Sequence, residues 1–375
     1  MVGLAYFFIV GFAIGYVFLI LYIIDGWDKT DTFSINEKNQ PKSGISVLIA
    51  ARNEENNIAE CVQSILSNNT DSPYEIIIIN DHSTDQTLQI IKNITDYKVI
   101  VLDLPDGLTG KKSALSFGIT SARYDLILCT DADSIVGRQW IQSHQHFQAE
   151  HDYNIQTSLV MPEDNDTFLS RFQMMDFVAT MAITANGIQR KDYFLANGAN
   201  LCYKKSFFYD VKGFDGNQNI ASGDDVFMME KAAELAVDKI GFLKSLDAMV
   251  ITKSETTWTS LFNQRKRWAS KSMKTSDKNV VKIQAYVFLF CLIMLISIVL
   301  GPIFMPEILF ASLTALTIKM VVDYMFLSKL STYFEQEQVM KSFIPVFFIY
   351  FIHILYSGMI AMFPSSYVWK DRNNK

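Results

Sequence analysis

Long apolar runs at both ends of the chain restrict what it can fold into. Residues 2–24 carry no charged side chain, and a helix of that length, rising about 1.5 Å per residue, crosses a hydrocarbon core about 30 Å thick. Three more apolar runs follow later in the chain, near residues 285–304, 308–327 and 343–363. The sequence therefore predicts an N-terminal transmembrane helix within residues 1–25 and about three transmembrane helices within residues 284–364.

The residues beside these runs predict their orientation. Met1 leads directly into apolar residues, without the basic start of a cleaved signal peptide, so we expect a retained anchor. Lys29 and the basic residues between 271 and 282 favour a cytosolic location for the polar middle of the chain. We expect an integral protein of a bacterial inner membrane. If all four helices span, the basic C-terminus lies outside, so an alternative is that one C-terminal segment lies in the interface.

Two charged residues interrupt the run at residues 308–327. Lys319 and Asp323 are four residues apart, so they share one face of a helix and can pair. Their presence is explained either by mutual neutralisation or by a role in acceptor binding.

The composition argues against several classes of protein. A net charge of −6, with no stretch that interleaves basic and aromatic residues, argues against nucleic-acid binding. The chain lacks the G-x-x-x-x-G-K-[ST] loop of an ATPase and the G-x-G-x-x-G turn of a dehydrogenase, which argues against both classes. Its four cysteines have neither metal-ligand nor redox spacing, so we expect buried thiols in a reducing compartment. We expect surface positions and no zinc site for His82, His144, His146 and His151.

The polar middle, residues 44–255, predicts an α/β domain. Helical patterns alternate with short apolar strands, expected at residues 45–50, 75–80, 98–102 and 125–130. Isoleucines on both faces of the second strand indicate a buried parallel strand. A helix over residues 54–66, capped by Asn53, is expected after the first strand. This is a doubly wound, Rossmann-like layout, in which ligands bind beyond the carboxyl ends of the strands.

Polar and acidic residues stand at those strand ends. Arg52 and Glu54 follow the first strand, Asp81 follows the second, and Asp131 and Asp133 follow the fourth. The last two are separated by one residue, so in an extended segment both carboxylates point to the same side. Two oxygen ligands at this spacing suit Mg²⁺ or Mn²⁺, which also take oxygens from a bound diphosphate.

Two expected helix starts carry further charges. Lys111 begins one helix, where an ammonium and a helix N-terminus together favour an anion, although a solvated surface lysine is the alternative. Asp224 and Asp225 begin another. They either cap that helix or include a base that deprotonates a hydroxyl group, and no histidine or cysteine nucleophile competes nearby.

Residues 256–283 predict a helix in the membrane interface. Its apolar side chains, among them Trp258, Leu261 and Trp268, lie on one side, and basic residues are distributed around the rest.

Taken in order, these motifs resemble the inverting family 2 glycosyltransferases with the GT-A fold, a group that includes cellulose and hyaluronan synthases and ceramide glucosyltransferases. The resemblance covers about residues 45–268. It is carried by Ala51-Arg52-Asn53-Glu54-Glu55, residues 80–85, Gly110-Lys111, Asp131-Ala132-Asp133, Asp224-Asp225 and Gln264-Arg265-Lys266-Arg267-Trp268. The last, a Gln-x-x-Arg-Trp motif, is the most specific. Ala50 stands where the family often has proline, and Asp224 replaces the usual glutamate, which leaves the role of Asp224 open.

The resemblance implies a membrane-bound transferase that moves a sugar, with inversion, from a UDP- or GDP-sugar to a lipid-linked or saccharide acceptor. It implies that Asp225 is the catalytic base and that Asp131 and Asp133 hold the divalent metal. The substrate-binding residues that it implies are Arg52, Glu54, Asp81, Lys111, Asp131, Asp224, Gln264, Arg267 and Trp268.

Two alternatives remain open. A processive polysaccharide synthase uses the same motifs, but four spans offer little material for a channel, so single transfer is favoured. A membrane-tethered nucleotide-binding regulatory protein is the alternative of another class. A candidate base together with a Gln-x-x-Arg-Trp motif argues against it, because a binding protein needs neither.

Overall fold

The structure is a computed structural model that describes residues 2–36, 41, 43–217, 223–272, 277–361, 367–369 and 372–374. The chain forms two compact units. The first, here called the membrane-helix unit, comprises Met1–Lys29, Asp164–Asn186 and Glu255–Tyr367. The second, here called the sheet unit, comprises Thr30–Glu163, Gly187–Ser254 and Val368–Lys375.

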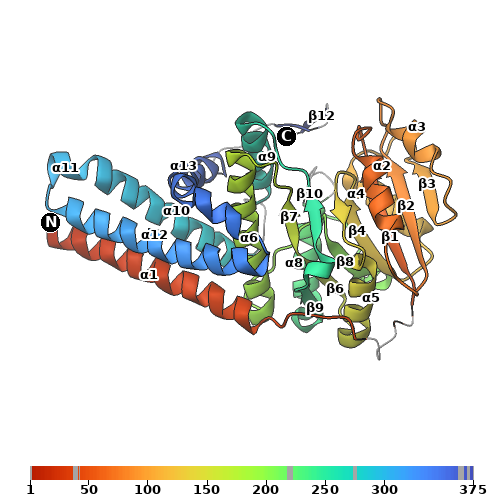
Figure 1. Cartoon of the computed structure of the whole chain (residues 1–375), viewed down its shortest axis with the longest axis horizontal. Helices are drawn as coiled ribbons and strands as arrows, with labels where there is room; N and C mark the ends of the chain where they lie inside the picture. The colour runs from red at the N-terminus through yellow and green to blue at the C-terminus, as the bar shows by residue number, and fades with distance from the viewer. Residues whose placement is uncertain are drawn as a thin grey trace. The chain divides into compact units, whose positions relative to one another are not determined.

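A seven-stranded mixed sheet forms the core of the sheet unit (Figure 1). In spatial order its strands are β3 (Val99–Asp103), β2 (Tyr74–Asn80), β1 (Ile45–Ala51), β4 (Leu126–Asp131), β8 (Leu201–Lys204), β6 (Ile155–Ser158) and β9 (Ile240–Leu243). The first four are parallel, β8 runs antiparallel to both β4 and β6, and β9 is parallel to β6. The four strands expected from the sequence are therefore confirmed, within an α/β fold that continues beyond them.

Helices and a smaller sheet complete this unit. Helix α4 packs against β1 and β2. The helices are α2 (Ile58–Leu66), α3 (Thr87–Lys92), α4 (Lys111–Ser121), α5 (Trp140–His151), α7 (Lys205–Asp210) and α8 (Asp224–Ala236), with 3-10 turns at Val237–Lys239 and Leu246–Ala248. The smaller sheet has the order β5 (Ile135–Val136), β10 (Val250–Thr252) and β7 (Val160–Pro162). Strands β11 (Tyr367–Trp369) and β12 (Arg372–Asn374) pair with each other.

Sequence and burial agree in the second strand, while the helix before it begins late. Ile76–Ile79 are fully buried, as expected for a parallel strand flanked on both sides by β1 and β3. Helix α2 begins at Ile58, whereas the sequence predicted residue 54. Asn53 has φ 51°, a left-handed conformation that a helix cap does not use, so the chain turns through residues 52–57 before the helix begins.

Long helices dominate the membrane-helix unit. They are α1 (Val2–Lys29), α6 (Phe168–Arg190, whose last turn belongs to the sheet unit), α9 (Trp258–Ser272), α10 (Lys278–Val299), α11 (Gly301–Phe304), α12 (Ile308–Tyr333) and α13 (Phe343–Ala361), with a 3-10 turn at Glu337–Ser342. Four of the described helical segments are long and apolar enough to cross a membrane: Gly3–Lys29, Lys278–Val299, Ile308–Tyr333 and Glu337–Ile360. The membrane helices expected at both ends are thus present by length and composition.

Helices α1 and α12 pack side by side (Figure 1). Lys319 and Asp323 of α12 form the expected ion pair and also contact the hydroxyl group of Tyr16 on α1. Mutual neutralisation therefore accounts for the two charges inside an apolar helix.

The domain boundaries inferred from the sequence at residues 44, 255 and 284 stay predictions. Residues Asp164–Asn186, which the sequence placed in the α/β domain, belong to the membrane-helix unit. Within the predicted ranges, residues 1, 218–222, 273–276 and 362–364 lie outside the described part of the chain.

Candidate active site

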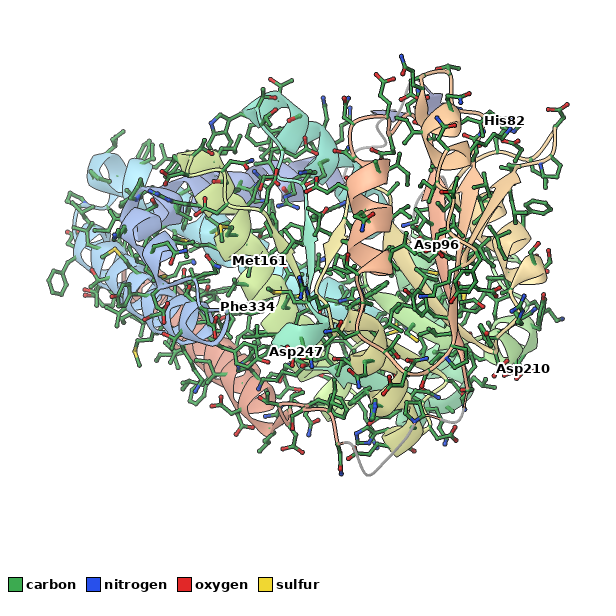
Figure 2. All side chains as sticks on the ribbon, turned by 45° about the vertical axis from the view of Figure 1, so that its right-hand side comes forward. His82, Asp96, Met161, Asp210, Asp247 and Phe334 are labelled. Carbon is green, nitrogen blue, oxygen red and sulfur yellow. The ribbon has the colours of Figure 1, made fainter. Side chains whose placement is uncertain are left out.

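The loops after β1 and β2 are bound to each other at the carboxyl edge of the sheet. The Arg52 guanidinium donates hydrogen bonds to the backbone carbonyls of Asp81 and His82, both at 2.9 Å. The backbone N–H of Glu54 donates to Oγ1 of Thr87 at 2.7 Å. Figure 2 shows His82 of the second loop at the edge of the sheet unit. Arg52 and Glu54 therefore hold together the loops that follow the two strands. Their contacts with a nucleotide stay predictions.

Asp81 links this edge to the start of α4. Its side chain is almost fully buried, and its Oδ2 accepts a hydrogen bond from the backbone N–H of Gly110 at 3.0 Å. Gly110 has φ 89°, a conformation that glycine adopts without strain, and Lys111 begins the helix directly after it. Asp81 thus fixes the position from which the Lys111 side chain extends.

Lys111 joins the acidic residues of two different elements. Its ammonium lies 2.7 Å from Oδ1 of Asp131, at the end of β4, and 3.1 Å from Oδ2 of Asp224, at the start of α8. Burial alone lowers the pKa of an ammonium, but the Asp131 and Asp224 carboxylates raise the pKa of Lys111 well above its ordinary value. Lys111 therefore keeps its positive charge throughout the neutral pH range.

Asp225 is held beside this cluster by backbone donors. Its Oδ2 accepts a hydrogen bond from the N–H of Gly198 at 3.2 Å, and its Oδ1 accepts one from the N–H of Val226 at 2.8 Å. Asp224 and Asp225 are both largely buried in the first turn of α8, where the helix dipole favours negative charge. The expected start of α8 near its two aspartates is confirmed, and the structure brings Asp225 to the same cluster as Asp131.

Asp131 is the last residue of β4 and Asp133 lies in the turn that follows it, so the extended geometry assumed for the pair is wrong. The N–H of Ser134 donates to the carbonyl of Asp131 at 3.1 Å, which closes the turn. Both carboxylates are nevertheless near Cys61: burial, together with Asp133 and Asp131, raises the pKa of its thiol well above the ordinary value.

The carboxylate oxygens of Asp131 and Asp133 are of the ligand type that a hard divalent ion prefers. The Asp131 side chain is 39% exposed, so an incoming ion can reach it. Within the described ranges, no group of three or more His, Cys, Asp or Glu side chains is arranged to hold a metal. Mg²⁺ is commonly bound by one or two carboxylates, with substrate phosphates and water completing its shell. The assignment of Asp131 and Asp133 as ligands stays a prediction.

Gly198 is a site residue that the sequence reasoning missed. Besides its hydrogen bond to Asp225, a Cβ atom at this position would lie 3.0 Å from both Oδ2 of Asp224 and Nζ of Lys111. The Asn197-Gly198 pair before β8 was the available signal, because such a pair marks a turn. Nothing in one sequence indicates which groups pack against such a turn.

Two histidines contradict the surface position expected from the sequence. His144 and His146 were expected at the surface, but both are buried on α5. Nε2 of His144 lies 2.9 Å from Oδ1 of Asn200, and its Nδ1 lies 3.0 Å from Nε2 of Gln156. Burial lowers the pKa of His144 to about 4, so it is neutral near pH 7. Its partners are the amide side chains of Asn200 and Gln156, 56 and 12 positions away in the sequence, so no local pattern indicated its burial.

The Gln-x-x-Arg-Trp residues lie on α9, in the membrane-helix unit. Nε2 of Gln264 donates to Oε1 of Glu255 at 3.1 Å. The Trp268 ring packs edge to face against Phe177 of α6, with ring centroids 5.8 Å apart. Arg267 and Trp268 are half-buried. Their predicted contacts with a substrate stay predictions.

Comparison with known proteins assigns a family to the middle of the chain. The model of the family described as Glycosyl transferase family 2 matches residues 46–212. Poly-beta-1,6-N-acetyl-D-glucosamine synthase of Staphylococcus aureus (strain MSSA476) is 27% identical over 276 residues, which are 68% of this chain and 62% of that protein. The enzyme of the same name from Staphylococcus epidermidis is 37% identical over 105 residues, 27% of this chain and 24% of that protein. The match thus spans less than two thirds of these relatives.

A solved structure supports the fold. The mannosyltransferase PcManGT from Pyrobaculum calidifontis, solved in complex with GDP-Man and Mn²⁺, superimposes with a TM-score of 0.56 at 15% sequence identity. The similarity covers 90% of this chain and 95% of that one. At this identity the likeness concerns the fold alone. Residues 46–212 are therefore a glycosyltransferase family 2 domain, of the α/β GT-A type with a mixed sheet.

Proposed function

We propose that this chain is a membrane-bound inverting glycosyltransferase that moves a sugar from a UDP- or GDP-sugar to a lipid-linked or saccharide acceptor. One observation carries the proposal most directly: Lys111 joins Asp131 and Asp224, with Asp225 beside them, at the carboxyl edge of a family 2 domain. In sheets of this kind a nucleotide binds beyond that edge.

The proposed reaction is a single in-line displacement. Asp225 accepts the proton of the acceptor hydroxyl group while the oxygen of that hydroxyl group forms a bond to the anomeric carbon. The bond from that carbon to the diphosphate breaks, and its electron pair leaves with the diphosphate. The N–H groups of Gly198 and Val226 hold the Asp225 carboxylate in one orientation, which such a base requires.

Positive charge near the leaving group is the second requirement. A divalent ion, Mg²⁺ or Mn²⁺, held by Asp131 and Asp133 would stabilise the departing diphosphate. Lys111 is a fixed cation that supplies further positive charge to the same group. For Arg52, Glu54, Asp81 and Asp224 we propose roles in shaping the nucleotide site. For Gln264, Arg267 and Trp268 we propose donor or acceptor contacts, which rest on the motif.

A processive polysaccharide synthase is the second candidate. The matched staphylococcal relatives are named as synthases of a poly-N-acetylglucosamine, which favours it. A regulatory protein that only binds a nucleotide gains no support from the relatives. For the location we propose a bacterial inner membrane, with the sheet unit in the cytosol.

Purified full-length protein in detergent tests the proposal. We expect thermal stabilisation by UDP or GDP or their sugars, with a larger effect when Mn²⁺ is present, followed by metal-dependent transfer or slow donor hydrolysis. UDP-N-acetylglucosamine is the first donor to try, given the relatives' product. A gel of the products separates single transfer from polymer synthesis. Stabilisation without any donor cleavage would favour the regulatory alternative, and no response to any nucleotide would overturn the proposal.

A further inference from the structure

A buried ion pair ties the Gln-x-x-Arg-Trp helix to α6 within the membrane-helix unit. Nη2 of Arg265 on α9 lies 2.5 Å from Oδ2 of Asp176 on α6, and the two side chains are only 5% and 11% exposed. Tyr350 of α13 lies beside the same carboxylate. Asp176 therefore connects three helices at one point.

The same arginine is stacked on the tryptophan of the motif. Its guanidinium carbon lies 4.2 Å from the centroid of the Trp268 ring and 5.8 Å from that of Phe177. Phe177 itself packs against Trp268. The indole is thus restricted by a cation over its ring and by an inclined aromatic ring beside it.

The position of Arg265 depends on Asp176. Apart from the contact with Asp176, the guanidinium nitrogens of Arg265 have no hydrogen-bond partner among the described residues. Its burial is therefore compensated by the Asp176 charge and by the two aromatic rings. Burying an arginine without a counter-charge is strongly unfavourable, so loss of the carboxylate would displace the guanidinium toward water. Trp268 would then lose the group that fixes its ring.

We infer that Asp176 is a positioning residue for the transfer reaction and acts on Trp268 through Arg265. The inference rests on the proposed function, because it takes Trp268 as a substrate contact. Arg265 occupies a variable position of the Gln-x-x-Arg-Trp motif, so the motif alone assigns it no role. The structure connects to this motif a residue of α6, Asp176, which lies far from α9 in the sequence.

A double-mutant cycle tests this inference on the full chain in detergent, with UDP-N-acetylglucosamine, or the donor found in the screen, as the probe. We expect D176N and W268F each to lower kcat/KM about tenfold. The double variant should be no worse than W268F alone, because both changes act through one group. R265K keeps the ion pair but loses the planar stack, and should reproduce most of the loss if D176N folds poorly.

The matched control is D323N, which breaks another buried ion pair of the same unit, on α12 and outside the motif helix α9. It should lower thermal stability without changing KM, and its effect should add to that of W268F. Independent losses for D176N and W268F would overturn the inference, as would a D323N profile equal to that of D176N.

A fluorescence measurement keeps the inference testable if no donor is turned over. The Trp268 contribution, taken as the emission difference between wild type and W268F, should shift to longer wavelength in the D176N background as the indole becomes wetter. An unchanged difference spectrum would overturn the positioning role. Absence of product from the wild-type chain with every nucleotide sugar would instead overturn the proposed function.

Discussion

Lys111 and Asp224 begin two different helices, yet their charged groups lie 3.1 Å apart. This contact fixes the start of α8, and therefore Asp225, relative to α4 and the end of β4. Gly198 packs against the pair so closely that a side chain there would have to displace it. The proposed base and the proposed diphosphate-binding lysine are thus positioned by one set of contacts.

The substitution Gly198→Ala is expected to impair catalysis more than folding. The new methyl group would lie 3.0 Å from both Nζ of Lys111 and Oδ2 of Asp224, so the ion pair must shift by a few tenths of an ångström. We expect kcat/KM to fall about tenfold, since small misplacements of catalytic groups are costly. Steady-state kinetics and thermal unfolding measure the two effects. Gly137→Ala is the control, because its methyl group would make an ordinary 3.5 Å contact; equal kinetics for both variants would contradict the prediction.

The substitution Asp225→Asn is expected to abolish transfer while the nucleotide still binds. The amide keeps the size of the carboxylate but cannot accept the proton, so turnover should fall by about 10³-fold or more. The UDP or GDP concentration required for thermal stabilisation should change by less than about twofold. Glu234→Gln, at an exposed position of the same helix, is the control. Wild-type turnover in Asp225→Asn would refute the base assignment.

The sequence predicted the parallel half of the sheet because its signals are local. Four isoleucines in succession, Ile76–Ile79, place apolar side chains on both faces of a strand, which favours a strand that is covered on both faces. The residues after each strand could then be named, because parallel strands end at one edge. Strands β6, β8 and β9 were missed, since each has four residues and β8 takes its place only through long-range antiparallel pairing.

Contacts between distant residues account for the rest of what the sequence did not reveal. The sequence left Lys111 either as part of an anion site or as a solvated surface lysine, whereas its contacts with Asp131 and Asp224 join residues that are distant in the sequence. Asp176 lies in an apolar stretch that carries no motif, so nothing local indicated its pairing with Arg265. The motifs predicted the residues of the candidate site, whereas the residues that contact them could be identified only from the fold.

Buried His144 predicts a specific pH dependence of stability. Its pKa falls from 6.5 to about 4 on folding, so below pH 6.5 the unfolded chain binds a proton that the folded chain does not. Stability should therefore decrease as the pH falls from 6.5 to about 4, by up to about 1.4 kcal/mol per pH unit from this residue. Above pH 6.5 His144 adds no slope.

The comparison of variants isolates this contribution from that of the carboxylates. His144→Gln should lower stability at pH 7, because it disturbs the contacts with Asn200 and Gln156, and should also reduce the slope between pH 6.5 and 4. His151→Gln, at an exposed position of the same helix, should leave the slope unchanged. Unfolding midpoints across this pH range provide the measurement, and identical slopes for wild type and His144→Gln would exclude His144 as their source.

The buried pair on α12 predicts a rescue between two destabilising changes. Oδ1 of Asp323 accepts a hydrogen bond from Tyr16 at 2.6 Å, while Lys319 lies close to both groups. Asp323→Leu leaves an unpaired ammonium among apolar helices, which we expect to cost about 3–5 kcal/mol. Adding Lys319→Met removes that charge and should restore most of the loss.

An exposed ion pair between the same two helices supplies the control for this prediction. Lys329 and Asp28 also join α12 to α1, but their side chains are roughly half exposed, so Lys329→Met should cost less than about 1 kcal/mol. Thermal unfolding in one detergent ranks all the variants. A double variant less stable than Asp323→Leu alone would mean that the stem of Lys319, and not its charge balance with Asp323, stabilises the helix pair.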